Sequence, residues 1–308
     1  HYAYDYARWL MVGAPVFAFS MLLQSFVRND KNPKLAMVAV IAGGVLNTFL
    51  DWLFIYPMQL GMTGAIVASV IGTGVTCLIL CLHFFRKECN LRFSFKKLRS
   101  RYSKEIVQYG ASSFLTELSG GVLIFVLNQQ ALLYAGELGV TVYSVLTNSA
   151  YIVNAFSNGI AQAAQPIIAT NFGAKAQDRI DALKGIGLRT ALIAGCTFAA
   201  LGLLFPQAVV YIFVHPTEAI LELAPMAVRI YFIGFIGAAL NIFFTSYFQA
   251  TLQPSKALTV CMLRGLILSA LFAYTLPLVL DIIGIWASIL LAEFITLGIA
   301  VAMDRKKK

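Results

Sequence analysis

Long apolar stretches alternate with short polar connections along the whole chain. Each apolar stretch is long enough to cross a bilayer as a helix, which needs about 20 residues. Only helices and closed barrels satisfy their backbone hydrogen bonds in lipid, and these stretches are too long and too continuously apolar to be barrel strands. The pattern therefore predicts nine membrane-spanning helices, at roughly 9–27, 35–56, 62–85, 106–134, 141–170, 187–213, 227–248, 257–279 and 283–303.

Two neighbouring apolar stretches carry a row of polar side chains. The residues recur every three or four positions, so they line one face of a helix. Such side chains are costly in hydrocarbon unless they face protein or water, which indicates a substrate or ion pathway, although amides also join helices by hydrogen bonds. The row consists of Glu117, Asn148, Tyr151, Asn154, Asn158, Gln162 and Gln165.

Other ionisable residues also fall within apolar stretches. Glu117 is the first candidate for ion coupling, because burial and nearby cations change the protonation of a carboxylate in opposite directions. Asp51 follows Asn47 by one helical turn and is either a second ion ligand or a structural acid. Arg264 and Glu293 lie in neighbouring stretches, where pairing would keep both in the membrane, and we favour that structural role over transport.

Composition and charge support a multi-pass membrane protein. Hydrophobic residues make up 59% of the 308 residues, and charged residues only 12%. The formal charge of +9 comes from lysines and arginines in short connections, which predicts membrane orientation and not nucleic-acid binding. The basic connections should be cytoplasmic, together with the carboxyl terminus, and they lie at 28–34, 86–104, 175–189, 256 and 305–308.

Cysteine and histidine usage argues against a metal-dependent or disulfide-bonded protein. Four of the five cysteines fall inside apolar stretches, and the spacing matches no zinc site. His83 and His215 are isolated in the sequence, and no catalytic triad or phosphate-binding loop is visible. We therefore expect no enzyme and no cofactor. The sequence suggests no ion other than the coupling ion, which we expect to be Na⁺ or H⁺. A Na⁺ ion could bind at Glu117.

An internal repeat relates the first three predicted spans to the last three. A shift of 221 residues places Arg8 on Arg229 and Pro33 on Pro254. Two copies in the same orientation are familiar in transporters built of two halves. The repeat predicts a parent of twelve spans in two pseudo-symmetric six-helix lobes, from which the first three helices are missing. The predicted parts are an incomplete first lobe at 1–86, a basic cytoplasmic linker at 87–104 and a second lobe at 105–308.

Several local sequences occur in a recognisable order and spacing. They are Asn47–Asp51 (NTFLD), Leu60–Ala65 (LGMTGA), Tyr109–Gly110 followed by Glu117, Gln165–Pro166 and Asn171–Ala174 (NFGA). In this order and spacing they resemble the fourth to twelfth helices of the multidrug and toxic compound extrusion (MATE) family. The resemblance implies export of organic cations, driven by inward flow of Na⁺ or H⁺ across the bacterial cytoplasmic membrane. One departure is Asn241, which stands where some relatives have an acid.

The resemblance and the residues leave three function classes. The first is a secondary active exporter of small lipophilic cations, with aromatic faces from Tyr109, Phe114, Tyr143 and Tyr151. We expect this exporter to act as a monomer in the lipid bilayer, without nucleic acid. The second is a flippase for lipid-linked saccharides, whose polyanionic headgroup would need several cations where only Arg264 is available. The third is a channel or membrane enzyme, for which no motif is present.

Overall fold

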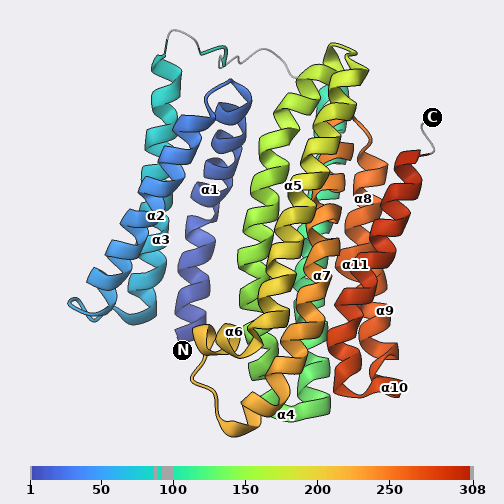
Figure 1. Cartoon of the computed structure of the whole chain (residues 1–308). Helices are drawn as coiled ribbons and strands as arrows, with labels where there is room; N and C mark the ends of the chain where they lie inside the picture. The colour runs from blue at the N-terminus through green and yellow to red at the C-terminus, as the bar shows by residue number, and fades with distance from the viewer. Residues whose placement is uncertain (1, 87–88, 92–99, 306–308) are drawn as a thin grey trace. The chain divides into compact units, whose positions relative to one another are not determined.

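Two compact units make up the chain, a first unit His1–Lys97 and a second unit Leu98–Lys308. The computed structural model describes residues 2–86, 89–91 and 100–305. Every regular element in these ranges is a helix (Figure 1). The predicted all-α membrane helix bundle is confirmed, because eight helices of the described ranges have the length and hydropathy of membrane spans. The linker predicted at 87–104 lies mostly outside the described residues, and a helix already begins within it, at Ser100.

The first unit is a three-helix bundle in which α3 packs against both α1 and α2. Its elements are α1 (Tyr2–Asn29), α2 (Pro33–Ile55), α3 (Gly61–Cys81) and a 3₁₀ turn, η1 (Leu82–Phe85). Glycines bring α2 and α3 close together, since a Cβ on Gly43 would lie 2.6 Å from the carbonyl oxygen of Gly72. The Thr76 hydroxyl donates across the same contact to the Ala39 carbonyl at 3.2 Å. Small residues and interhelical hydrogen bonds are how helices associate in lipid.

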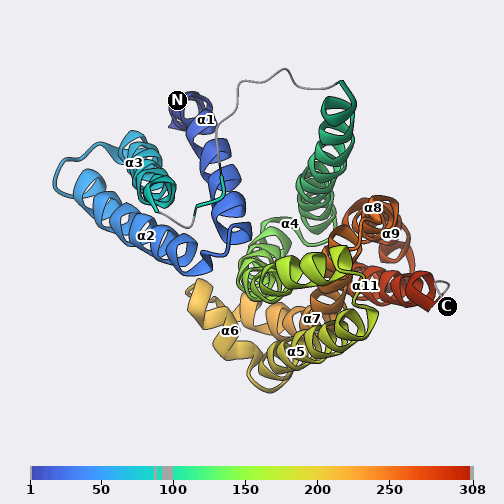
Figure 2. The same cartoon turned by 90° about the horizontal axis from the view of Figure 1, so that it is seen from above.

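The second unit is built around α7, which Figure 2 shows between α5 and α11. Of the most apolar window of α7, 72% is buried, against 39% or less in every other described span. Phe232, Phe235, Phe243 and Phe248 of α7 are core residues of this unit. Its elements are α4 (Ser100–Gly173), α5 (Gln177–Leu204), α6 (Pro206–Phe213), α7 (Glu218–Ala250), α8 (Pro254–Met262), the π turn η2 (Leu263–Ile267), α9 (Leu268–Thr275), α10 (Pro277–Leu280) and α11 (Ile282–Arg305).

Helix α4 contains two of the predicted spans, joined at a sharp break. Ala135 and Gly136 have non-helical backbone angles, and Gly136 has a positive φ of 58° that glycine adopts without steric cost. Beyond the break, Gly139 lies so close to the carbonyl of Ala131 that a Cβ would not fit. The first arm (100–134) and the second arm (137–173) therefore fold back on each other, so the spans predicted at 106–134 and 141–170 are both present.

One predicted span is displaced from its observed helix. The stretch at 187–213 was expected to be a single helix, but α5 begins ten residues earlier, at Gln177, and ends at Leu204. It ends there because Pro206 cannot continue the hydrogen-bond ladder and instead opens the short helix α6. At its other end α5 runs on into polar sequence that the apolar pattern alone does not mark as helix.

Helix boundaries follow the predicted repeat. Pro33 and Pro254, which the 221-residue shift superimposes, are each the first residue of their helix. The same shift places the end of α1 at Asn29 on the end of α7 at Ala250, and the start of α3 at Gly61 on the start of α11 at Ile282. The two copies thus share their helix limits as well as scattered identities.

A tight contact between α5 and α7 predicts the outcome of one glycine substitution. A Cβ at Gly195 would lie 2.8 Å from Cα of Ile236, a backbone atom that cannot move aside cheaply. Gly195→Ala should therefore lower the free energy of unfolding by about 1–3 kcal/mol through overpacking. Gly185→Ala in the same helix meets nothing within 4 Å and should be neutral or slightly stabilising, because alanine favours helix. Equal thermal midpoints of the two purified variants in detergent would contradict this packing.

Candidate functional site

A cavity of about 230 Å³ lies inside the second unit. Both arms of α4, together with α7, α8, the π turn η2 and α11, contribute to its walls. These walls belong to membrane-length helices, so the cavity places polar and aromatic groups within the spans. Its principal polar and aromatic lining residues are Tyr143, Thr147, Tyr151, Asn154, Tyr231, Phe235, Arg264 and Glu293.

An ion pair joins the π turn to α11 at the cavity wall. Arg264 donates from Nη2 to Glu293 Oε1 at 2.7 Å and from Nε to both carboxylate oxygens at 3.0 and 3.1 Å. Asn241 of α7 donates from Nδ2 to Glu293 Oε2 at 2.7 Å and to the Glu293 backbone carbonyl at 2.8 Å. The predicted pairing of Arg264 with Glu293 is confirmed. The Arg264 side chain is 21% exposed and the Glu293 side chain 7%, so the carboxylate is the more deeply buried partner of the ion pair.

The arginine lies on an irregular turn. Residues Leu263–Ile267 form a π turn, which carries an extra residue compared with an α-helical turn. The Ser269 hydroxyl donates to the Arg264 carbonyl. Single π turns inside α-helices are frequent at functional sites, and this one carries Arg264.

The repeat shows that the fold does not require this charged cluster. The shift of 221 residues that aligns the two copies places Asn241 on Ser20 and Arg264 on Gly43, and the shift of 219 that aligns the later part places Glu293 on Gly74. In the first unit Gly43 packs directly against α3, with no charged group in the contact. The three-helix arrangement therefore forms with small residues at these positions. The polar cluster of the second unit adds something beyond packing.

Aromatic rings form much of the remaining wall. Tyr143 stacks on Trp286 with ring centroids 6.5 Å apart, and Tyr231 meets Phe235 edge to face at 5.6 Å. Tyr143 is only 3% exposed and Tyr231 8%, so packing holds both rings in place. Tyr151, by contrast, is 61% exposed. Fixed aromatic faces beside a polar cluster suit a lipophilic cation, which they attract through the ring quadrupole.

The sequence pattern of the MatE family matches residues 112–275, more than half of the chain. The chain belongs to the MatE family. The matched segment lies entirely within the second unit and includes most of both arms of α4 and most of the cavity wall.

Two relatives of this MatE chain are multidrug export proteins named MepA. The protein of Staphylococcus haemolyticus is 23% identical over 295 residues, which cover 95% of this chain and 64% of that protein. The protein of Staphylococcus aureus strain bovine RF122 is 21% identical over 300 residues, covering 94% of this chain and 64% of that protein. The chain therefore spans about two thirds, at 64%, of the length of these relatives. Both names describe export, and neither describes an enzymatic reaction, which agrees with the prediction that the chain is not an enzyme.

Solved structures show the same fold. An outward-facing multidrug resistance MATE family transporter of the MOP superfamily superimposes with a TM-score of 0.91 at 23% identity, covering 98% of this chain and 68% of that one. A MOP superfamily transporter from Pyrococcus furiosus gives the same TM-score and identity and covers 98% and 69%. The MatE chain is thus a multi-pass membrane protein with the transporter fold.

Part of the predicted polar row lines the cavity. Tyr151 and Asn154 both contribute to the wall, from the second arm of α4. Asn158 follows Asn154 by one turn on the same face and is exposed. The row therefore extends beyond the cavity along the α4 surface.

Glu117 lies on the opposite arm, just beyond the cavity wall. Gly120, Ile124 and Leu127 of the first arm line the cavity at helical spacing. Glu117 precedes Gly120 by three residues, so it continues the same face of the helix, and its side chain is exposed. The geometry brings the carboxylate within one helical turn of the cavity lining, and its coupling role stays a prediction.

The remaining residues of the row lie outside the cavity lining. Asn148 and Gln162 are exposed, and Gln165 donates to Gln249 Oε1 of α7 at 3.5 Å. Among the predicted aromatic residues, Phe114 is 65% exposed, and the side chain of Tyr109 lies outside the described residues. These positions join helices or form surface of the second unit.

The two predicted residues of the first unit lie on α2. Asn47 donates from Nδ2 to the Ser69 hydroxyl of α3 at 3.3 Å. Asp51 has one carboxylate oxygen, Oδ1, buried without a hydrogen-bond partner in the described part of the chain. The two hypotheses for Asp51, a second ion ligand and a structural acid, both stay open.

The sequence pattern missed the contribution of α7 to the cavity. Tyr231 and Phe235 read as ordinary core residues, because α7 is apolar on all sides. One available signal was the repeat, since comparing equivalent positions isolates Asn241, Arg264 and Glu293 as polar residues where the first copy has small ones.

The structure also corrects the prediction that His83 is isolated. Its Nε2 lies 2.8 Å from Asp30 Oδ2, and Asp30, His83 and Cys89 form one cluster. The residues come from three separate segments of the first unit, so no local spacing in the sequence reveals them.

Proposed function

We propose that this chain is part of a secondary active multidrug exporter in the bacterial cytoplasmic membrane, which exchanges small lipophilic cations for Na⁺ or H⁺. The observation that carries the proposal is the cavity of the second unit, whose wall combines aromatic faces with a fully paired charge. Relatives whose alignments cover 94–95% of this chain, at 21–23% identity, are named for multidrug export. We expect the functional protein to have twelve spans and to act as a monomer.

Charge at the cavity favours a cation exporter over a saccharide flippase. Among the described lining residues Arg264 is the single cation, and Glu293 neutralises it through three hydrogen bonds. A polyanionic headgroup would need several uncompensated cations to replace its hydration. A lipophilic cation needs only aromatic faces and a nearby carboxylate. Glu117, one turn beyond the lining, can supply that carboxylate.

Drug accumulation tests the proposal in cells. A strain without its own efflux pumps, expressing the full-length transporter, should accumulate less of a fluorescent lipophilic cation than the same strain with an empty vector. Dissipating the Na⁺ and H⁺ gradients with ionophores should abolish the difference. Equal accumulation with and without the protein, at verified membrane expression, would refute cation export.

Membrane orientation gives a separate prediction. Lysines and arginines gather on alternate connections, so the segment after η1, which contains Cys89, should be cytoplasmic. In a variant whose other cysteines are serine, Cys89 should react with a membrane-impermeant maleimide only after cells are opened, with a chelator present. Met58→Cys, in the exposed turn after α2, is the matched control and should react from outside. The reverse labelling pattern would invert the topology.

A further inference from the structure

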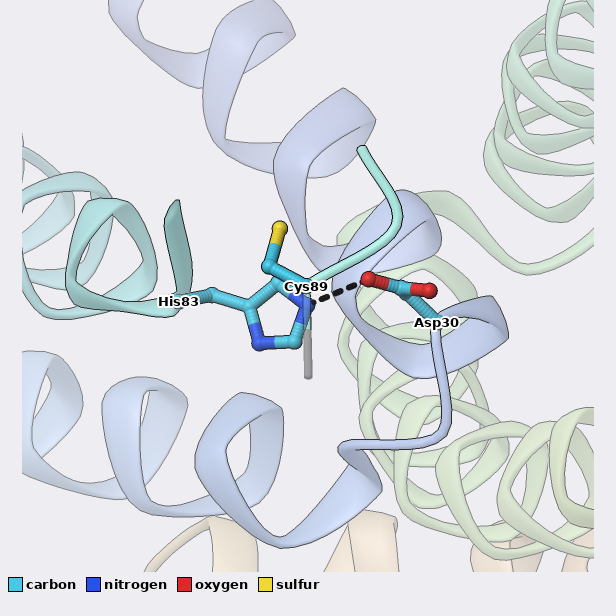
Figure 3. A group of neighbouring side chains, drawn as sticks. All are labelled: Asp30, His83 and Cys89. Carbon is cyan, nitrogen blue, oxygen red and sulfur yellow. Dashed lines mark hydrogen bonds and ion pairs between the residues drawn. The ribbon is translucent and has the colours of Figure 1, made fainter. Parts of the chain in front are cut away.

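Three metal-ligating side chains meet in the first unit, and the export proposal uses none of them. Asp30 lies in the turn after α1, His83 in η1, and Cys89 in the segment that follows (Figure 3). Their ligand atoms all lie within 4.8 Å of one another. The side chains of His83 and Asp30 are only 3% and 8% exposed. Figure 3 shows the Asp30 carboxylate facing the histidine ring, with Cys89 beside it.

Hydrogen bonds determine which nitrogen of His83 carries the proton. The Asn32 carbonyl oxygen accepts from the backbone N–H of Leu35 and caps α2, so its amide nitrogen faces His83 Nδ1 at 3.1 Å. Nδ1 must then accept, which places the proton on Nε2, where it donates to Asp30 Oδ2 at 2.8 Å. In this state the imidazole is neutral.

The Asp30 carboxylate accepts hydrogen bonds on both of its oxygens. The Asn90 side chain donates to Oδ1 at 3.0 Å, and the Asn90 backbone N–H donates to Oδ2 at 2.9 Å. Together with the contact to His83, these bonds fix the Asp30 carboxylate beside the imidazole. A carboxylate, an imidazole and a thiol are thus held in one cluster.

We propose that Asp30, His83 and Cys89 bind a Zn²⁺ ion, with water as the fourth ligand. Carboxylate oxygen, imidazole nitrogen and thiolate sulfur are the three ligand types that zinc uses in proteins, at about 2.0–2.3 Å. Tetrahedral geometry at those lengths separates the ligand atoms by about 3.3–3.8 Å. The 2.8 Å between His83 Nε2 and Asp30 Oδ2 is shorter than this range, and the ligand atoms of all three residues lie within 4.8 Å of one another, so shifts of about an ångström or less assemble the site.

Zinc binding changes the protons in a defined way. The Cys89 thiol loses its proton to solvent and becomes the thiolate ligand. The His83 proton moves from Nε2 to Nδ1, which frees the Nε2 lone pair for the metal. Asn32 must then rotate its amide to accept from Nδ1–H, and in doing so it gives up the cap on Leu35. Asn32 thus opposes the metal-bound form, whereas an aspartate there would accept from both groups at once.

Metal titration of the whole 308-residue chain, purified in detergent without a histidine tag, tests the proposal. Competition with a chromogenic chelator should show one Zn²⁺ per chain, and Co²⁺ in its place should give a thiolate-to-metal charge-transfer absorption. Cys89→Ser should abolish that absorption and weaken Zn²⁺ binding at least tenfold. The matched control, Cys196→Ser on the exposed surface of α5, should change neither.

Asn32→Asp separates a metal site from a hydrogen-bonded structural cluster. As a carboxylate acceptor for His83 Nδ1–H, it should tighten Zn²⁺ binding by about tenfold, the scale of such outer-ligand effects. It keeps the α2 cap, so loss of folding is not expected. Absence of stoichiometric Zn²⁺ binding by the folded chain, or binding that Cys89→Ser leaves unchanged, would overturn the proposal.

Discussion

Replacing Arg264 with methionine is expected to destabilise the second unit by about 3–5 kcal/mol, the scale for breaking a buried ion pair from one side. The substitution leaves the Glu293 carboxylate, 7% exposed, with Asn241 as its remaining described hydrogen-bond donor. A charge left alone in a low-dielectric interior costs more than the lost attraction itself. Thermal or denaturant unfolding of the purified chain in detergent measures the effect.

A second ion pair provides the matched control for Arg264→Met. Lys184 and Asp304 join α5 to α11 at 2.8 Å, nearly the same length as the 2.7 Å Arg264–Glu293 contact. Their side chains are 22% and 18% exposed, so water compensates a lost partner better than it does for Glu293. Lys184→Met should cost about 0–1 kcal/mol.

Replacing both partners of the inner pair tests the same account from the other direction. Arg264→Met combined with Glu293→Leu leaves no unpaired charge, so it should recover most of the stability that Arg264→Met loses. If the single Arg264 variant were no less stable than the Lys184 variant, burial of the pair would have no energetic consequence.

Replacing Glu117 with glutamine in the full-length transporter is expected to abolish ion-coupled efflux while leaving membrane insertion intact. Glutamine keeps the shape and most hydrogen bonds of the side chain and removes the charge. A carboxylate near the cavity can hold a proton, a Na⁺ ion or a cationic drug, and mutual neutralisation makes simultaneous occupancy costly. That competition is what an exchanger needs.

Drug binding gives the Glu117 prediction a magnitude. Losing one favourable contact to a partly desolvated charge costs about 1.5–3 kcal/mol, or about one to two decades of affinity for a monovalent cationic drug. A neutral drug of similar size should lose much less. If Glu117 serves only helix packing, the variant will lose thermal stability but keep the pH or Na⁺ dependence of efflux. Glu137→Gln, at the start of the second arm and next to the break in α4, is a control expected to transport normally.

The helices and the inner ion pair were predictable from sequence because each depends on local composition or on an unavoidable cost. A stretch such as 283–303 has few stable states in lipid other than a helix, and α11 covers Ile282–Arg305. Arg264 and Glu293 could hardly remain apart inside the membrane, so their pairing followed from adjacency of the two spans. The repeat placed Pro33 on Pro254 from sequence alone, and the structure shows that both prolines begin helices.

Features that depend on three-dimensional contact were not predictable. Nothing in the local sequence of α7 distinguishes Tyr231, which lines the cavity, from its buried neighbours. His83 and Asp30 are 53 residues apart and meet only after α1, α2 and α3 pack together. The early start of α5 at Gln177 was missed because its first turns are polar, and a hydrophobic pattern marks the membrane segment and not the whole helix.

Transport by the purified full-length protein in liposomes tests the central claim most directly. A fluorescent lipophilic cation is placed on the cytoplasmic side of the protein. A Na⁺ or H⁺ gradient is imposed across the vesicle membrane so that the ion flows toward that cytoplasmic side. The account predicts cation movement that requires one of these gradients, stops when an ionophore collapses it, and is lost in Glu117→Gln. Movement of a lipid-linked saccharide between leaflets, with no cation transport under either gradient, would contradict it.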